Sequence, residues 1–133
     1  MHSERFDGHK LRLTEEEWKK RLDAEQFQVL RRQGTEPPFC NAHFDTKKKG
    51  TYVCAGCGLP LFSSQEKYDS GTGWPSYLQP IYNENVSYRE DGSRIEVICS
   101  RCEGHLGHVF PDGPPPTGKR YCMNSLAMRF IPH

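Results

Sequence analysis

The chain of 133 residues has no long apolar run and no excess of either charge. No stretch approaches the roughly 18 apolar residues that a membrane-spanning helix needs. Lys and Arg number 18 and Asp and Glu number 17, so no overall field favours nucleic acid or an anionic membrane. The N-terminus lacks the basic and then apolar layout of a signal peptide. We therefore expect a cytoplasmic protein that binds neither nucleic acid nor membranes, and we expect it to be a monomer.

The length fits one domain spanning residues 1–133, with a modest core that a metal cross-link would strengthen. Within this domain we predict an extended segment at 1–12 and a helical cap at 13–34. Residues 35–133 are predicted to form a metal-stapled β core that carries the active site.

Two helix-start signals occur near the N-terminus. Thr14 is followed three residues later by Glu17, and Asp23 is followed by Gln26, which is the capping-box pattern. The sequence therefore predicts two short helices with a break at Asp23, and Gly34 ends the second.

Beyond Thr35, Gly and Pro interrupt short runs of β-forming residues. The turn sequence Glu-Asp-Gly-Ser at 90–93 predicts a hairpin, and the three prolines at 114–116 predict an exposed loop. The fold class is mainly β and antiparallel, with an N-terminal pair of short helices. The candidate strands are 50–53, 59–63, 86–90, 94–100, 107–110 and 120–131.

Four of the six cysteines form two C-x-x-C pairs, Cys54/Cys57 and Cys99/Cys102. Four thiolates favour a tetrahedral Zn²⁺ ion, with iron as the main competitor. Such a closed site leaves no open coordination position, so the metal would be structural. Two independent C-x-x-C redox pairs are the alternative.

The other two cysteines are Cys40, in a Pro-rich loop, and Cys122. In a strand, Arg120, Cys122 and Asn124 would share one face, followed by an apolar stripe at 126, 128 and 130. A neighbouring positive charge stabilises a reactive thiolate. Because a lone strand cysteine is usually an inert core residue, this pattern alone leaves both interpretations open.

His105, His108 and Asp112 gather just after the second cysteine pair. The two histidines would face opposite ways in a regular strand, so a shared site requires a bend, which Gly107 permits. A second metal site, a proton-transfer pair and plain surface polarity are the options. No further metal ligands are evident, so we favour proton transfer.

These strings carry a family resemblance. Over residues 13–132 the chain resembles the B-type methionine sulfoxide reductases, which reduce the R epimer of methionine sulfoxide. The matching strings, in the family's order, are 35–39, the two C-x-x-C pairs, 69–76, 105–112 and 120–125. The resemblance implies two antiparallel sheets, one structural Zn²⁺ per chain, and oxidised proteins or peptides containing methionine-R-sulfoxide as substrates.

By this resemblance, the thiolate of Cys122 attacks the sulfoxide and becomes a sulfenic acid, and a second thiol converts it to a disulfide that thioredoxin reduces. Protons would come from His105 and His108, with Asp112 acting through water. The remaining expected roles are a lowered pKa of Cys122 from Arg120, orientation by Asn124, and substrate binding by Trp74 and Phe110.

Thr72 stands where many members of this family have a recycling cysteine. Cys40 is the spare thiol outside the metal pairs, so we assign it as the resolving cysteine; recycling by an external thiol is the alternative. Two other functions compete with the reductase. One is a zinc-ribbon binding module without catalysis, and the other is a cysteine hydrolase that uses Cys122 with one of the histidines.

Overall fold

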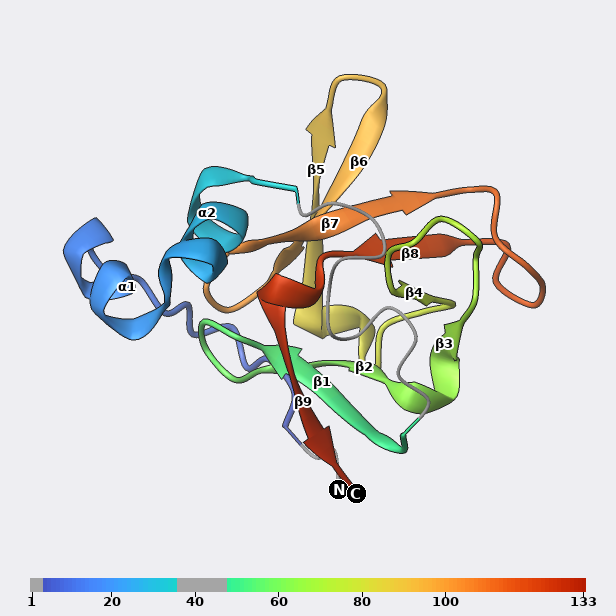
Figure 1. The fold of residues 1–133 in the computed structure, drawn as a ribbon, viewed down its shortest axis with the longest axis horizontal. Helices are drawn as coiled ribbons and strands as arrows, with labels where there is room; N and C mark the ends of the chain where they lie inside the picture. The colour runs from blue at the N-terminus through green and yellow to red at the C-terminus, as the bar shows by residue number, and fades with distance from the viewer. Residues whose placement is uncertain (1–3, 36–47) are drawn as a thin grey trace.

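The computed structural model describes residues 4–35 and 48–133, which form two antiparallel sheets and an N-terminal pair of helices (Figure 1). This confirms the predicted fold class. The helices are α1 (Glu15–Arg21) and α2 (Ala24–Arg32). The smaller sheet has the order β2-β1-β9, formed by Pro60–Ser63, Gly50–Cys54 and Met128–Pro132. The larger sheet has the order β3-β4-β8-β7-β6-β5, formed by Lys67–Tyr68, Ser76–Tyr77, Arg120–Met123, His105–Phe110, Arg94–Cys99 and Val86–Asp91.

Both predicted helix starts are confirmed. The Thr14 hydroxyl accepts from Glu17 N at 3.2 Å while Thr14 N donates to the Glu17 carboxylate, and Asp23 and Gln26 make the same reciprocal pair. Helix α2 ends at Gln33, which has left-handed backbone (φ 56°), and it packs against β7. Among the described residues, no helix is long and apolar enough to cross a membrane.

An aromatic cluster joins the two sheets. Phe62 of β2 stacks on Tyr77 of β4 with ring centroids 4.5 Å apart, and Tyr52 of β1 meets the edge of Tyr77 at 5.4 Å. Tyr121 of β8 closes the cluster against Phe62. Burial of these rings supplies much of the apolar area that fixes one sheet on the other.

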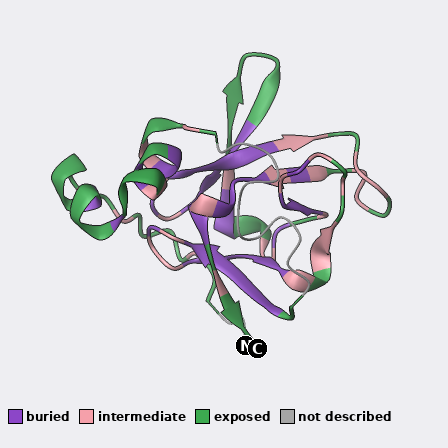
Figure 2. Ribbon diagram, viewed as in Figure 1, coloured by how far each residue is buried: buried purple, intermediate pink, exposed green. Residues whose placement is uncertain are grey.

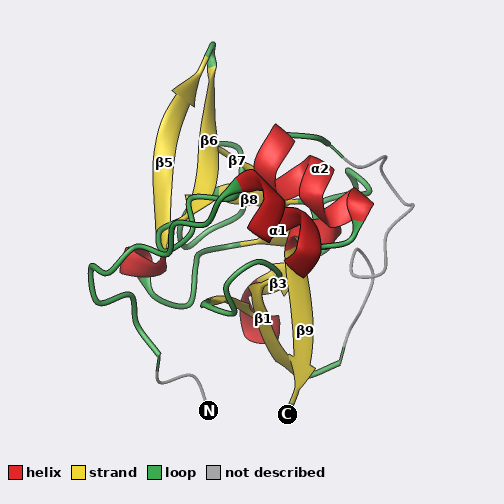
Figure 3. Ribbon diagram, turned by 90° about the vertical axis from the view of Figure 1, so that its left-hand side faces the viewer, coloured by secondary structure: helices red, strands yellow, loops and turns green. Residues whose placement is uncertain are grey.

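The predicted hairpin at 90–93 is confirmed. Asp91 pairs with Arg94 across the turn, and Gly92 takes the positive φ (61°) that such a turn requires. The β5–β6 hairpin projects from the rest of the fold (Figure 3), and its outer part is exposed while its base is buried (Figure 2).

The prediction of one strand at 120–131 is wrong. The segment contains β8, then a 3₁₀ turn η3 (Ser125–Ala127), then β9, and the two strands belong to different sheets. Asn124 ends β8 because its backbone N–H and its side-chain amide both donate to Leu106 O. The chain then turns at η3 to pair with β1, so the expected single face from Arg120 to residue 130 does not exist.

Two short strands were not predicted. β3 and β4 contain two residues each, too few to show an alternating pattern. They matter for the site because β4 pairs directly with β8, and Ser76 lies opposite Cys122.

Candidate active site and metal cluster

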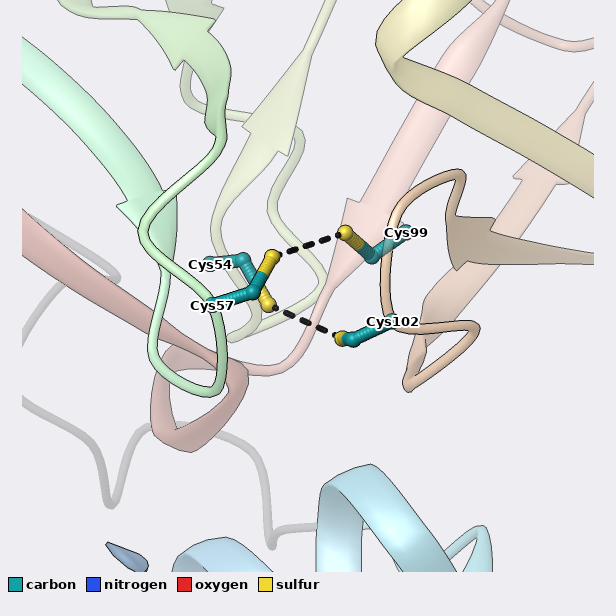
Figure 4. Close-up of side chains that lie close together, drawn as sticks. All are labelled: Cys54, Cys57, Cys99 and Cys102. Atoms are coloured by element: carbon teal, nitrogen blue, oxygen red, sulfur yellow. Dashed lines mark hydrogen bonds between the residues drawn. The ribbon is translucent and has the colours of Figure 1, made fainter. Parts of the chain in front are cut away.

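The two C-x-x-C pairs meet in space at the turns that follow β1 and β6 (Figure 4). All four sulfur atoms lie within 4.8 Å of one another, with Cys54 Sγ 3.6 Å from Cys102 Sγ and Cys57 Sγ 3.4 Å from Cys99 Sγ. A tetrahedral Zn²⁺ with Zn–S bonds of about 2.3 Å requires sulfur separations of about 3.8 Å. The cluster can therefore hold a metal ion of that size with small adjustments.

The two turns have the same hydrogen-bond pattern. Gly58 N donates to Cys54 O in the first turn, and Glu103 N donates to Cys99 O in the second. Both donors have positive φ, 82° at Gly58 and 61° at Glu103. The second turn thus places a glutamate in a conformation that favours glycine, although Gly104 follows directly.

The helices cover the metal cluster. Trp18 of α1 is buried and packs on Gly56, and Arg31 of α2 donates to Cys102 O at 2.8 Å. Hydrogen bonding to Cys102 and burial raise the pKa of the Cys54 thiol well above its usual value. A cation at the centre would supply the compensation that ionised thiols need in such a place.

A row of polar side chains crosses the larger sheet from one edge to the other. Directly opposed residues in an antiparallel sheet point to the same face, and five successive pairings connect this row. We call it the cross-strand row. From β3 to β5 it contains Tyr68, Ser76, Cys122, His108, Glu96 and Arg89.

A β-bulge brings His105 to the same face. Val97 pairs with Gly107 but Ile98 pairs with His105, so Leu106 is the extra residue of β7. The two histidines are three residues apart and would face opposite ways in a regular strand, but the extra residue turns both to one face. Their ring centroids lie 5.4 Å apart. The predicted bend therefore exists, one residue before Gly107, and Asn124 fixes it through its two bonds to Leu106 O.

A cavity of about 300 Å³ opens beside Cys122. It brings together six of the residues predicted for the active site: Trp74, His108, Phe110, Arg120, Cys122 and Asn124. The other lining residues are Thr35, Thr72, Arg94, Gly107 and Met123. Apolar walls with a few convergent polar groups are typical of a small-molecule or side-chain binding site.

The loop before β4 builds one wall of this cavity. Gly71 (φ 77°) and Gly73 (φ 88°) both have left-handed backbone, and they fold the loop so that Thr72 and Trp74 line the cavity. The Thr72 hydroxyl lies 2.8 Å from Ser70 Oγ, which fixes the loop from inside. Thr72 therefore lines the same cavity as Cys122.

Arg120 is held by two partners. Asp112 accepts from it at 2.9 and 3.2 Å in a bidentate pair, and its guanidinium lies 4.3 Å over the Phe110 ring. Its hydrogen bonds to Asp112 raise the pKa of Arg120, so the group is a permanent cation. Asp112 is exposed and contacts Arg120. Its expected role of serving the histidines through water came from the family resemblance and stays a prediction.

Comparison with known proteins shows the family of the chain. The SelR domain model matches residues 22–132. The chain is 57% identical over 121 residues to a Methanosarcina barkeri protein named peptide methionine sulfoxide reductase MsrB, covering 88% of this chain and 85% of that protein. Proteins of that name from Hahella chejuensis and Leptospira interrogans are 50% and 51% identical, covering 91% and 92% of this chain and 90% and 97% of theirs. The chain belongs to the B-type methionine sulfoxide reductase family.

In this reductase-family chain, the carboxylate beside His108 is one that sequence reasoning missed. His108 Nε2 donates to Asp91 Oδ2 at 2.8 Å, and this bond holds the pKa of Asp91 below its usual value. Asp91 comes from the tip of the β5–β6 hairpin. Only the antiparallel register of β5, β6 and β7 brings it near, so no local sequence signal could have identified it.

His105 lies deeper than His108 and does not line the Cys122 cavity. It lines a different, polar cavity of about 290 Å³, and its Nδ1 lies 2.7 Å from Glu96 Oε2. Burial lowers the pKa of His105 from its usual 6.5, and the hydrogen bond to Glu96 opposes this effect. Cys40, the predicted resolving cysteine of this reductase-family chain, lies outside the described residues.

Proposed function

We propose that this protein reduces methionine-R-sulfoxide in peptides and proteins, with Cys122 as the nucleophile. The Cys122 thiolate attacks the sulfoxide sulfur, one proton is taken up, and the oxygen ends on Cys122 as a sulfenic acid. The substrate sulfur gains two electrons and leaves as methionine, while the cysteine sulfur loses two. The position of Cys122 between β4 and β7, on the wall of a cavity, supports this role.

Proton delivery is assigned to His108, which is the cross-strand partner of Cys122. Asp91 holds the His108 ring through the 2.8 Å bond, so the imidazole needs little reorganisation during the reaction. Trp74 and Phe110 are apolar groups of the same cavity and suit the terminal methyl and the methylenes of the substrate.

Recycling requires a second thiol. Its sulfur attacks the Cys122 sulfenic acid, a disulfide forms, and the oxygen leaves as water. We assign this thiol to Cys40, because Thr72 occupies the cavity position where many family members have a cysteine. The disulfide is then reduced by the dithiol of thioredoxin.

The metal is proposed to be Zn²⁺ with a structural role. All four ligands are cysteines, so no coordination position is left for substrate. The site ties the turn after β1 to the turn after β6, and therefore the smaller sheet to the larger one.

The single observation that carries the proposal is that one cavity is lined by Cys122, His108 and Trp74. The test measures reduction of R- and S-methionine sulfoxide in a peptide, with dithiothreitol or with thioredoxin as reductant. We expect R-only activity that is abolished in Cys122→Ser with either reductant. Cys40→Ser should stay active with dithiothreitol and lose activity with thioredoxin.

Two results would contradict this proposal. Sulfoxide reduction that persists in Cys122→Ser would exclude Cys122 as nucleophile. Full thioredoxin-driven turnover in Cys40→Ser would leave the reductase in place but overturn its recycling step.

A further inference from the structure

A carboxylate and an imidazole are buried together on the face of the larger sheet that carries Cys122. Glu96 is 2% exposed and His105 is 4% exposed, and their side chains meet at 2.7 Å. Desolvating an ionisable pair is costly, and replacing such a pair by apolar residues of similar volume is often neutral or stabilising. Packing alone therefore gives no reason for these two residues.

The hydrogen bonds define the state of the pair. An ionised carboxylate only accepts hydrogen bonds, so Nδ1 of His105 is the donor to Glu96. Gln33 Nε2 also donates to Glu96, at 3.3 and 3.2 Å from its two oxygens. Both neighbours of the Glu96 carboxylate therefore contact it through nitrogen atoms that can donate.

The second ring nitrogen of His105, Nε2, takes no part in the bond to Glu96. Nε2 is buried and has no hydrogen-bond partner among the described residues. The His105 ring meets the His108 ring in an edge arrangement at 5.4 Å, and His108 is the residue opposite Cys122. Nε2 of His105 is thus an unused proton-exchange position close to the proposed proton donor.

We propose that Glu96 is a positioning residue of the sulfoxide reduction, which fixes His105 as the Nδ1–H tautomer and leaves Nε2 to exchange protons beside His108. The inference rests on the proposed function. This role also gives a reason for the register of β6 and β7, because Glu96 is itself the cross-strand partner of His108. A single carboxylate thereby lies next to both imidazoles.

The inference gives the helical cap a part in the reaction. Gln33 follows the last turn of α2, and its left-handed backbone directs the chain out of the helix. Its side chain reaches Glu96 from outside the sheet. The end of α2 therefore supports the carboxylate that supports His105.

The test compares the zinc-loaded wild type with Glu96→Gln and with the control Glu103→Gln. Glu103 lines the same polar cavity, but its carboxylate pairs with the basic side chains of Lys10, Arg12 and Arg89 and not with His105, so it controls for a lost charge. Long-range ¹H–¹⁵N NMR identifies the tautomer of His105. Single-turnover reduction of a methionine-R-sulfoxide peptide gives the rate, and its substrate dependence gives the apparent affinity.

We expect an Nδ1–H His105 in the wild type and in Glu103→Gln, and a mixture of both tautomers in Glu96→Gln, because the glutamine amide can donate to Nδ1 as well as accept from it. The single-turnover rate of Glu96→Gln should fall by about 10- to 100-fold, the range known for removing a carboxylate that orients a metal-bound histidine, with little change in apparent affinity. A merely structural glutamate would not change the tautomer.

An Nε2–H tautomer in the wild type overturns the inference without any variant, even where Glu96→Gln fails to fold. A folded Glu96→Gln with a rate within twofold of the wild type also overturns it. After either of these two results, the proposed function still holds if the wild type reduces the R-sulfoxide. Wild type without sulfoxide reduction removes the proposed function itself.

Discussion

Gly107 is a position at which a single added methyl group should be strongly destabilising. It lies on β7 opposite Met123 of β8, one residue from the His108–Cys122 pair. A Cβ at Gly107 would lie 2.1 Å from Cys122 O and 2.9 Å from Met123 Cα, and both are backbone atoms. Because contacts below 3.0 Å essentially never occur for a real Cβ, the two strands must move apart.

The size of the effect follows from the geometry. Moving β7 from β8 by about 1 Å lengthens the nearest ladder hydrogen bonds beyond the about 3.2 Å limit of a good bond. Two such bonds at about 1 kcal/mol each, with about 2 kcal/mol for overpacking, give a loss of about 4 kcal/mol. For a chain of this length that corresponds to a fall in Tm of about 15 °C.

The assay is thermal unfolding of zinc-loaded Gly107→Ala, together with R-sulfoxide reduction below its Tm. We expect both a lower Tm and a loss of activity, because the strained strands carry Cys122 and His108. Gly92→Ala is the matched control: its Cβ would meet nothing within 4 Å, and only the positive φ (61°) opposes it, at a cost of about 1 kcal/mol. A Gly107→Ala protein with a Tm within about 3 °C of wild type would refute the reasoning, since a loss of about 4 kcal/mol could not be hidden.

Three further outcomes are expected. Chelation of the metal should lower the Tm by more than about 10 °C, because metal binding and folding are coupled, and β-sheet circular dichroism that persists on heating would contradict this. Asp112→Asn should lower kcat/KM for the R-sulfoxide by releasing Arg120, yet change the Tm by no more than a few degrees, since exposed ion pairs contribute about 0–1 kcal/mol; unchanged kinetics would show that the pair does not orient Arg120. The lowered pKa of His105 means that the unfolded state binds this proton more readily, so its contribution to stability is complete above pH 6.5 and decreases as the pH falls toward the folded-state pKa. Urea unfolding at pH 7 and pH 5 should therefore show a smaller pH effect in His105→Gln than in wild type, and equal effects would contradict the assignment.

Local signals in the sequence predicted the local structure. The capping boxes at Thr14 and Asp23 depend on residues three positions apart, and the turn at Gly92 depends on four consecutive residues. The two C-x-x-C pairs predicted the cluster of four cysteines because each pair is set by its own turn. In each case the determining interaction lies within a few residues of the chain.

The features that the sequence did not predict depend on distant partners. The break after Met123 arises because Asn124 bonds to Leu106, a residue of another strand. The contact of His108 with Asp91 depends on the register of three strands. His105 and His108 lie on the same face of the sheet because of a bulge at Leu106. No residue type in the sequence marks the location of that bulge.

The cross-strand row makes the chemistry a property of alignment between strands and frees the connecting loops from that constraint. A hairpin turn or the loop at 111–119 can change length without shifting the row, provided that the paired residues keep their partners. One residue inserted inside β7 or β8, by contrast, would turn every following side chain to the opposite face. Insertion scanning of this chain should therefore separate two kinds of position. Insertions in the loops should preserve activity, whereas a single residue inserted within these strands should abolish it.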